Sequence, residues 1–273
     1  MADRTGQQLG NYRLIRKLSE DGLAEVYLGE DLRLKTMVAI KIMQTKIPRS
    51  EDMERFVMEA RTIAHLQHPN IVRVLDFGVQ GEMPFLVMDY APQDPLQSTL
   101  RQRHPKGSIL PLATIKSYVE QVAAALQYVH DQKLIHRDIK PENMVIGRNS
   151  EILLSGFSNV VVAQSSRYQT TLAIVGTADY MAPEQIQGKP RFASDQYSLA
   201  IVAYEWLCGD RPFHGSFTEM YTQHMFATPP SLREKVPTVP QEVEQVVMTA
   251  LEKDLNKRFA SVSAFANAFE QTS

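Results

Sequence analysis

Short apolar segments dominate the first ninety residues of the chain. Three of them, residues 12–18, 25–31 and 36–43, are rich in Val, Ile, Leu and Tyr, a composition typical of β-strands. The pattern predicts three consecutive antiparallel strands, and a fourth apolar run at residues 83–90 predicts another strand.

Helical periodicity interrupts these strands once and dominates the second half of the chain. Apolar residues recur at helical spacing in residues 52–66, and again in residues 112–131, where they predict a long helix with one buried face. The pattern predicts two further short strands and three further helices, at 144–146, 152–154, 194–208, 241–251 and 264–269.

The composition is that of an ordinary globular protein, with 44% hydrophobic residues among 273. The 29 basic and 31 acidic residues give a net charge of −2, which gives no reason to expect a nucleic acid or an anionic membrane as a partner. No run of 18 apolar residues predicts a membrane span, and the start, Met-Ala-Asp-Arg, lacks the apolar core of a signal peptide. We therefore expect a cytoplasmic chain. The single cysteine, Cys208, excludes an internal disulfide, and its apolar helix predicts a buried thiol.

One stretch concentrates the polar chemistry of the chain. Residues 136–143 read His-Arg-Asp-Ile-Lys-Pro-Glu-Asn and directly follow an apolar pair. In such a loop Asp138 can orient a substrate hydroxyl and accept its proton, and Lys140 can neutralise a transferring phosphoryl group. Asn143 can offer an amide oxygen to Mg²⁺. The chemistry that these residues support together is phosphoryl transfer.

The loop is similar to the catalytic loop H-R-D-L-x-x-x-N of protein kinases, with Ile139 in place of Leu. Two further phrases appear in the family's order: Val-Ala-Ile-Lys at 38–41, and Gly-Thr-Ala-Asp-Tyr-Met-Ala-Pro-Glu at 176–184. The chain therefore resembles bacterial eukaryotic-like (Hanks-type) Ser/Thr protein kinases over about residues 10–270. The resemblance implies a single kinase domain (1–273) with an α+β, two-lobed protein-kinase fold. The expected lobes are a small N-lobe with an antiparallel sheet and one main helix, and a larger, mostly helical C-lobe, at 10–90 and 91–270.

The resemblance also implies a site for ATP. Lys41 is expected to reach the α and β phosphates and to form an ion pair with Glu59, which lies in the phrase Arg-Phe-Val-Met-Glu-Ala. Met88 is expected to back the adenine pocket. The remaining pocket and hinge residues that the resemblance implies are Val26, Ala39, Asp89 and Ala91.

A further group of residues is expected to hold the catalytic loop in shape. Asp195 should brace the backbone of the loop, and Glu184 should pair with Arg258 of the phrase Lys-Asp-Leu-Asn-Lys-Arg. His136 and Phe157 take structural roles in the family, and the same roles are implied here.

The polar residues at 159–175, between Phe157 and the phrase at 176–184, fit an activation segment. Thr177 suits contact with Asp138 and Lys140, the arrangement of Ser/Thr-directed family members. Arg137 can pair with a phosphate on this segment. A polar loop without a regulatory role is the alternative interpretation. The candidate phosphorylation sites are Ser165, Ser166, Thr170 and Thr171.

The phosphate-binding loop departs from the family pattern G-x-G-x-x-G-x-V, in a register fixed by Val26. The three glycine positions then carry Ser19, Asp21 and Ala24, and the lone Gly22 is off the pattern. Glycine matters there because the backbone must approach phosphate oxygens without a Cβ in the way. The Asp21 carboxylate would also repel a triphosphate. A hairpin turn with no ligand is the alternative interpretation.

A second departure concerns the metal ion. The family writes L-x-D-F-G, and its Asp holds Mg²⁺ across the β and γ phosphates. Residues 154–158 read Leu-Ser-Gly-Phe-Ser, so aligning Phe157 puts Gly156 at the Asp position, and a slipped register puts Ser155 there. Neither register supplies a carboxylate, and Asn143 remains as the expected metal ligand. We expect Mg²⁺ or Mn²⁺ to bind weakly or not at all, while ATP binding stays possible.

Three functions are consistent with this sequence. The leading hypothesis is a pseudokinase, a regulatory or scaffolding module with weak or absent Mg-ATP phosphotransfer. The alternative is an active Ser/Thr kinase with an unorthodox metal site, supported by the retained Asp138, in which Asp21 or Glu142 supplies the missing carboxylate. The third is a metal-independent nucleotide sensor that uses Lys41 and the hinge. The expected partner or substrate is a protein rather than a nucleic acid.

Overall fold

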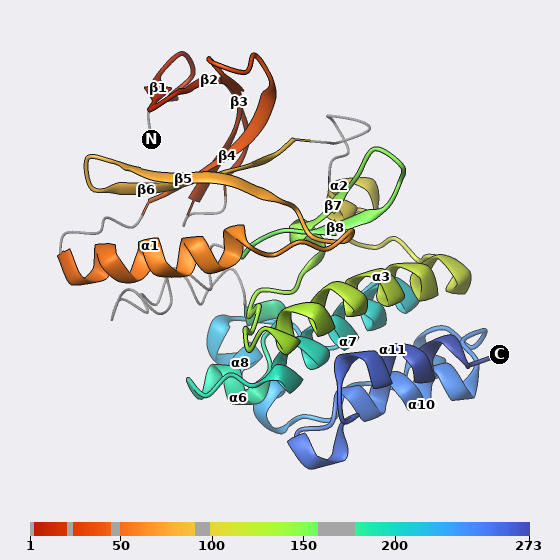
Figure 1. Cartoon of the computed structure of the whole chain (residues 1–273). Helices are drawn as coiled ribbons and strands as arrows, with labels where there is room; N and C mark the ends of the chain where they lie inside the picture. The colour runs from red at the N-terminus through yellow and green to blue at the C-terminus, as the bar shows by residue number, and fades with distance from the viewer. Residues whose placement is uncertain (1–2, 21–23, 45–49, 91–98, 158–177) are drawn as a thin grey trace. The chain divides into compact units, whose positions relative to one another are not determined.

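The computed structural model describes residues 3–20, 24–44, 50–90, 99–157 and 178–273, without the side chains of residues 50–53, 55 and 59 (Figure 1). By its internal contacts the chain forms two compact units. The described parts of Met1–Gln67 and Val72–Ala91, together with Phe157, belong to the first unit, and those of His68–Ile71, Pro92–Gly156 and Thr177–Ser273 form the second.

The first unit is built on one antiparallel sheet with the strand order β1-β2-β3-β4-β6-β5. The four strands predicted for this sheet are present as β2, β3, β4 and β6. The strands β1 and β5 were not among them, and the two residues of β1 carry no readable alternation. The strands are β1 Gln8–Leu9, β2 Tyr12–Glu20, β3 Ala24–Asp31, β4 Met37–Met43, β5 Val74–Gln80 and β6 Met83–Asp89.

The link between the first two predicted strands, which are β2 and β3 in the structure, is shorter than its polar sequence at residues 19–24 indicates. Ser19 and Glu20 belong to β2, where they pair with Val26 and Glu25 of β3. Backbone hydrogen bonds decide this pairing, and they do not depend on apolar side chains. Asp21 and Gly22 lie outside the described residues.

One face of this sheet carries the core of the first unit. Alternate residues of a strand point to opposite faces, so Tyr27, Ile40 and Ile42 lie together and pack with Phe85 and Val87. Helix α1 (Ser50–Ala64) begins and ends two residues before its predicted bounds. Its Phe56 is fully buried and meets Phe77 of β5 edge to face, with ring centroids 6.3 Å apart. Phe77 pairs with Leu86, so this contact lies on the opposite face of the sheet from Phe85 and Val87.

The second unit is mostly helical and is organised around α7, which is buried on all sides from Ser194 to Leu207. Helices α3, α10 and α11 pack against α7. Its helices are α2 Leu100–Arg103, α3 Leu112–Asp131, α6 Pro183–Ile186, α7 Phe192–Cys208, α8 Phe217–Phe226, α9 Leu232–Lys235, α10 Gln241–Ala250 and α11 Val262–Glu270. It also contains strands β7 Met144–Ile146 and β8 Ile152–Leu154, and the short 3₁₀ helices η1 Pro141–Asn143, η2 Ala178–Tyr180 and η3 Leu255–Lys257.

Sequence reasoning found α3, β7 and β8 at their predicted bounds but missed α8. Only Met220 and His224 of α8 are buried, so its apolar periodicity is weak. A capping box could have identified it: the backbone N–H of Ser216 donates to Glu219 Oε2 at 2.7 Å, and the Ser216 side chain accepts from the backbone N–H of Glu219.

The expectation of a buried thiol at Cys208 is wrong, because Cys208 is half-buried. It is the last residue of α7, and Gly209 turns the chain away with a left-handed φ of +79°. The Cys208 thiol lies 3.1 Å from the carbonyl oxygen of Asp210.

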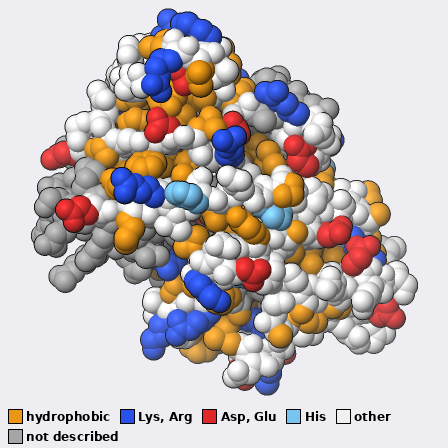
Figure 2. Space-filling model, in the orientation of Figure 1, with side chains coloured by type: hydrophobic (Ala, Val, Ile, Leu, Met, Phe, Trp, Pro, Cys, Tyr) orange, Lys and Arg blue, Asp and Glu red, His pale blue; other side chains and the backbone are white. Residues whose placement is uncertain are grey.

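The described helices show no membrane span, and the face of the molecule drawn in Figure 2 shows no strongly charged patch. Among the described helices, none combines the length and the apolar character that crossing a bilayer requires. On the face drawn in Figure 2, basic and acidic side chains are interspersed rather than gathered into one strongly charged patch.

A buried histidine in the second unit gives an expected dependence of stability on pH. His224 is fully buried, and its Nδ1 lies 3.0 Å from the hydroxyl of Tyr197. Burial, followed by the charges of Lys253 and Arg211, lowers the pKa of His224 to about 3. In the unfolded chain this pKa is about 6.5. Neutral, buried His224 therefore makes its full contribution to the free energy of unfolding above pH 6.5, and this contribution is lost as the pH falls toward 3.

We expect the free energy of unfolding to fall by about 2 kcal/mol between pH 6.5 and pH 5, at about 1.4 kcal/mol per pH unit, because His224 binds a proton only in the unfolded chain. His224→Asn keeps an acceptor for Tyr197 but does not titrate. The measurement is urea unfolding of both proteins at the two pH values. Equal losses in the two proteins would show that His224 is not the group responsible.

Candidate active site

The backbone of residues 136–138 is held by a single buried carboxylate. Asp195, in the first turn of α7, accepts hydrogen bonds from the backbone N–H groups of His136 and Arg137, both at 2.9 Å. His130 of α3 binds the same carboxylate at 2.7 Å. Arg137 has a left-handed φ of +70°, a strained conformation that these fixed bonds support. The brace expected from the sequence is therefore present.

The His136 side chain links this loop to Ser155, which directly follows β8. The ring is fully buried, and burial lowers the pKa of His136, so the imidazole is neutral. A neutral imidazole donates at one nitrogen and accepts at the other. Its Nε2 donates to the carbonyl oxygen of Ser155 at 2.8 Å, and its Nδ1 accepts from the backbone N–H of Asp138 at 3.3 Å.

The three predicted catalytic side chains come together around Asp138. Lys140 Nζ lies 3.0 Å from Asp138 Oδ1. Asn143, placed by η1, donates from Nδ2 to the Asp138 carbonyl oxygen at 2.7 Å and to Asp138 Oδ2 at 2.8 Å. Asp138 and Asn143 are both buried. Because the amide nitrogen of Asn143 faces Asp138, its amide oxygen is the atom that can bind a cation.

The residues at the family's metal-binding position carry no carboxylate and pack against Asn143. Ser155 donates to the Asn143 carbonyl oxygen from its backbone N–H at 2.8 Å and from its hydroxyl at 3.0 Å. Gly156 has a left-handed φ of +93°. A Cβ added to Gly156 would lie 2.6 Å from both Cγ and Nδ2 of Asn143. The amide of Asn143 therefore fills the space into which a side chain at residue 156 would extend.

No metal centre is apparent in the described part of the chain, where no three His, Cys, Asp or Glu side chains are grouped to hold an ion. Glu142, one of the two replacement carboxylates suggested by the sequence, is paired with Arg101 at 2.8 Å. Asp21, the other, lies outside the described residues.

In the first unit, four predicted nucleotide-site residues share one face of the sheet, opposite the core cluster around Tyr27 and Ile40. Val26 pairs directly with Lys41, and Ala39 pairs directly with Met88. Directly paired residues lie on the same face, as do Ala39 and Lys41 two positions apart. Asp89 is exposed at the end of β6.

Several predicted site residues, or their side chains, lie outside the described part of the structure. The backbone of Glu59 lies in α1, but its side chain is not described, so the expected ion pair with Lys41 is not tested. Phe157 is buried, as expected for a structural aromatic residue. The remaining predictions outside the described residues are Ala91, Ser165, Ser166, Thr170, Thr171 and Thr177.

The predicted ion pair between Glu184 and Arg258 is present. It is bidentate, with Nη1–Oε1 and Nη2–Oε2 distances of 2.9 Å each. Ser194 donates to Glu184 Oε1 at 2.7 Å, and the Arg258 guanidinium lies over the ring of Tyr197. This pair joins α6 to the turn before α11.

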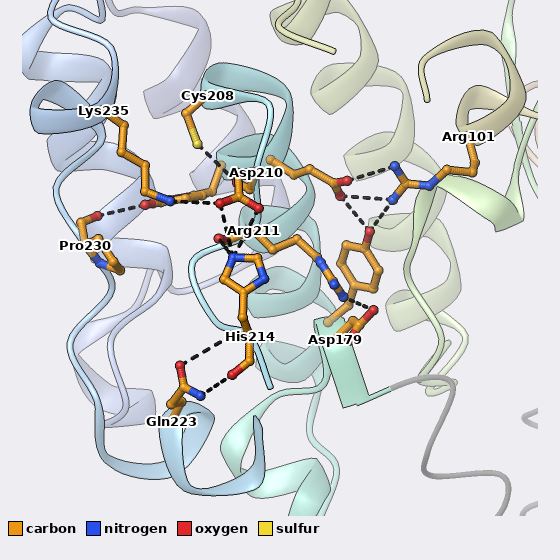
Figure 3. Close-up of polar contacts among 12 residues, drawn as sticks. Arg101, Asp179, Cys208, Asp210, Arg211, His214, Gln223, Pro230 and Lys235 are labelled. Atoms are coloured by element: carbon orange, nitrogen blue, oxygen red, sulfur yellow. Dashed lines mark hydrogen bonds and ion pairs between the residues drawn. The ribbon is translucent and has the colours of Figure 1, made fainter. Parts of the chain in front are cut away.

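Sequence reasoning missed a second polar cluster, around Arg101, which Figure 3 draws in part. Arg101 of α2 contacts Glu142, Glu205 of α7, and the hydroxyl of Tyr180 in η2. Tyr180 lies in the phrase at 176–184 that pointed to the family, but α2 is a four-residue helix without periodicity. The Thr99 and Gln102 capping box could have identified the start of α2, but no local signal in the sequence identified the contacts of Arg101.

Comparison with known proteins identifies the family. The family described as protein kinase domain matches residues 12–269. The chain is 36% identical to the Ser/Thr-protein kinase pkn2 of Myxococcus xanthus over 271 residues, which cover 95% of this chain and 32% of that protein. It is 35% identical to PknA of Mycobacterium tuberculosis over 277 residues, which cover 98% of this chain and 63% of PknA.

A solved structure gives the same result. The crystal structure of the PknI kinase domain of Mycobacterium tuberculosis superposes with a TM-score of 0.76 at 28% identity, covering 99% of each chain. The expected α+β kinase fold is thereby confirmed. The chain spans about a third to two thirds of the length of the curated relatives named above. It belongs to the protein kinase domain family, among the bacterial Hanks-type Ser/Thr kinases.

Proposed function

We propose that this kinase domain transfers phosphate from Mg-ATP weakly or not at all, and acts as a regulatory or scaffolding module that binds a protein partner. The proposal treats residues 1–273 as one domain, with lobes at 10–90 and 91–270. The observation that carries it is the packing at Gly156. A left-handed glycine stands at the family's metal-binding position, and the Asn143 amide occupies the space of its missing side chain.

The expected loss of activity follows from the charges involved. Phosphoryl transfer depends almost entirely on positioning and on stabilising negative charge. Removing one preorganised electrostatic group typically costs about 3–4 kcal/mol of barrier, a factor of about 10²–10³ in rate. An ATP-bound metal would have the Asn143 amide oxygen as its ligand in this unit, without the carboxylate that the family carries at the position of Gly156.

A second candidate, an active Ser/Thr kinase with an unorthodox metal site, is favoured by a different observation. Asp138, Lys140 and Asn143 are assembled within hydrogen-bonding distance, on a loop that Asp195 braces. In this candidate Asp138 accepts the proton of the substrate hydroxyl, and Lys140 neutralises the transferring group. ATP with a divalent metal supplies the phosphoryl group when bound. Glu142 would have to leave Arg101 to replace the missing carboxylate.

A thermal melt with ATP alone, and with ATP plus Mg²⁺ or Mn²⁺, distinguishes these candidates. A ligand at about 100 times its Kd stabilises the fold by about 2.7 kcal/mol, which raises Tm by several degrees. We expect the metal ions to add nothing to any shift that ATP produces. No shift in either condition supports a scaffold with an empty nucleotide site, and a shift with ATP alone supports a nucleotide sensor.

A clear metal-dependent shift would contradict the leading proposal and favour the active kinase. Phosphotransfer to a general protein substrate is then the next measurement, with Asp138→Asn as the control variant. Activity that depends on Asp138 should disappear in this variant. Activity that persists would come from a contaminating kinase.

A further inference from the structure

One guanidinium group joins three elements of the second unit. Arg101 Nη1 and Nη2 bind the two oxygens of Glu205 at 2.8 and 3.1 Å (Figure 3). Arg101 Nε donates to Glu142 at 2.8 Å. Arg101 Nη2 also donates to the hydroxyl of Tyr180. The hydroxyl in turn donates to Glu205 at 2.6 Å. Arg101 therefore links η1, α7 and η2 at once.

The bidentate Arg101–Glu205 ion pair of this network is buried, whereas the Arg101–Glu142 ion pair is partly exposed. The side chains of Glu205 and Arg101 are 4% and 15% exposed, whereas that of Glu142 is 42% exposed. Burial, followed by the charge of Glu205, raises the pKa of Tyr180, so its hydroxyl keeps the proton that it donates. Charge-assisted bidentate bonds are the stronger class of hydrogen bond, and burial removes competing water.

A second guanidinium holds η2 from its other side. Arg211 forms an ion pair with Asp179, and its guanidinium carbon lies 5.9 Å from the centre of the Tyr180 ring (Figure 3). Burial, and then the positive charge of Arg101, lowers the pKa of Arg211. Each of the two positive charges has its own acidic partner, Glu205 for Arg101 and Asp179 for Arg211, and these pairs hold Asp179 and Tyr180 in place.

The helix that carries Arg101 is itself anchored beside the catalytic loop. Thr99 and Gln102 form a capping box at the start of α2. Thr99 also forms a β-bridge to Val145 of β7, two residues after Asn143. The backbone next to Arg101 is therefore attached to β7, the strand that follows the loop, and the Arg101 guanidinium is attached to η2.

We propose that Arg101 is a positioning residue that couples the catalytic loop to the segment beginning at Ala178. The coupling acts through Glu142, which directly precedes Asn143, and through Tyr180, which precedes the α6 anchor at Glu184. Coupling between two sites is reciprocal, so a partner that orders or displaces η2 changes the mobility of η1, and the reverse. This inference goes beyond the proposed function and requires neither ATP binding nor phosphotransfer.

A separate contact joins the same two regions and has to be distinguished. Gln185 of α6 donates to the carbonyl oxygen of Arg137 at 2.5 Å. It reaches the start of the catalytic loop, whereas Arg101 reaches η1. Amides of residues 141–146 therefore report the Arg101 route, and Gln185→Ala serves as a comparison variant.

Amide hydrogen–deuterium exchange of the complete chain without ligands tests the proposal. Arg101→Gln should raise exchange at least about tenfold both in residues 141–146 and in residues 178–184, because it removes charge-assisted bonds to both. Arg103→Gln is the matched control, an exposed arginine on the same short helix, and should change neither region. A rise confined to the region around α2, or one spread evenly over the chain, would overturn the proposal.

A milder pair of variants keeps the test decisive if Arg101→Gln fails to fold. Tyr180→Phe keeps the ring but removes the hydroxyl that binds Arg101 and Glu205. Under the proposal, Tyr180→Phe raises exchange in residues 141–146 as well as in η2. In a chain that already carries Glu142→Gln, adding Tyr180→Phe should not raise exchange in residues 141–146 any further. An effect of Tyr180→Phe that stays within residues 178–184 contradicts the coupling. None of these readouts depends on whether the protein is a kinase or a pseudokinase.

Discussion

Arg258→Met is expected to lower the free energy of unfolding of the second unit by about 3–5 kcal/mol, the largest stability effect that we predict. The Arg258 side chain is fully buried, and Glu184, its bidentate partner, is 9% exposed. Removing the guanidinium leaves the Glu184 carboxylate buried, and within the described residues Ser194 is the donor that remains to it. Arg258 also donates to the carbonyl oxygens of Glu252 and Ala193, which lose a partner.

A double variant separates the uncompensated charge from the loss of packing. Glu184→Met combined with Arg258→Met removes both charges, and buried ion pairs replaced by apolar side chains of similar size often cost little. We expect the double variant to recover at least half of the loss. Lys257→Met, an exposed basic residue in the same turn, is the matched control and should lie within about 0.5 kcal/mol of wild type.

The measurement is chemical denaturation monitored by the fluorescence of Trp206, the single tryptophan, which is buried in α7 of the same unit. A loss below about 1 kcal/mol in Arg258→Met would mean that this pair does not hold α6 in place. A double variant as unstable as Arg258→Met would assign the effect to lost packing rather than to the unpaired Glu184.

The fold was predictable because its main elements carry strong local patterns. Helix α3 was placed to the residue, since Ile115, Val119, Val122 and Leu126 recur at helical spacing and are all fully buried. Strands β7 and β8 were likewise found, each as a short apolar run beside a polar turn. Short elements such as β1 and α2 contain too few residues to show a period.

The site was predictable where motifs fix it and unpredictable where distant residues meet. Asp138, Asn143 and Asp195 each lie in a recognisable phrase, and the structure brings them together. Arg101 contacts Glu205, which is 104 residues away, and no sequence pattern reports such a contact. The sequence showed that Gly156 lacks a carboxylate, but only the structure shows that Asn143 occupies the space beside it.

Gly156→Asp is expected to create a metal-dependent response, which the proposed function does not expect of the natural chain. The substitution places a carboxylate next to Asn143, where the family's L-x-D-F-G register puts its Mg²⁺ ligand. If a preorganised electrostatic group is worth about 3–4 kcal/mol, the affinity for ATP in the presence of Mg²⁺ can rise by up to about 10²–10³-fold. The measurement is titration of ATP with and without Mg²⁺ against wild type and variant.

The same substitution is expected to lower stability, for a reason that is independent of the metal. Gly156 has a φ of +93°, and its new Cβ would lie 2.6 Å from the Asn143 amide. The strained backbone and the displaced Asn143 together should cost about 1–3 kcal/mol. Gly156→Ala is the matched control, because it introduces the same Cβ without a carboxylate. It should lose stability and gain no dependence on Mg²⁺.

These two variants also decide the register of the altered motif. If Gly156→Asp behaves like Gly156→Ala in the titration, residue 156 is not the metal-binding position. Ser155→Asp then becomes the informative variant, since Ser155 occupies that position in the slipped register and its hydroxyl already bonds the Asn143 carbonyl oxygen. Failure of both aspartates to introduce a response to Mg²⁺ would mean that the missing carboxylate does not by itself limit the site. The altered phosphate loop, with Ser19 and Ala24 in place of glycines, would then be the next segment to restore.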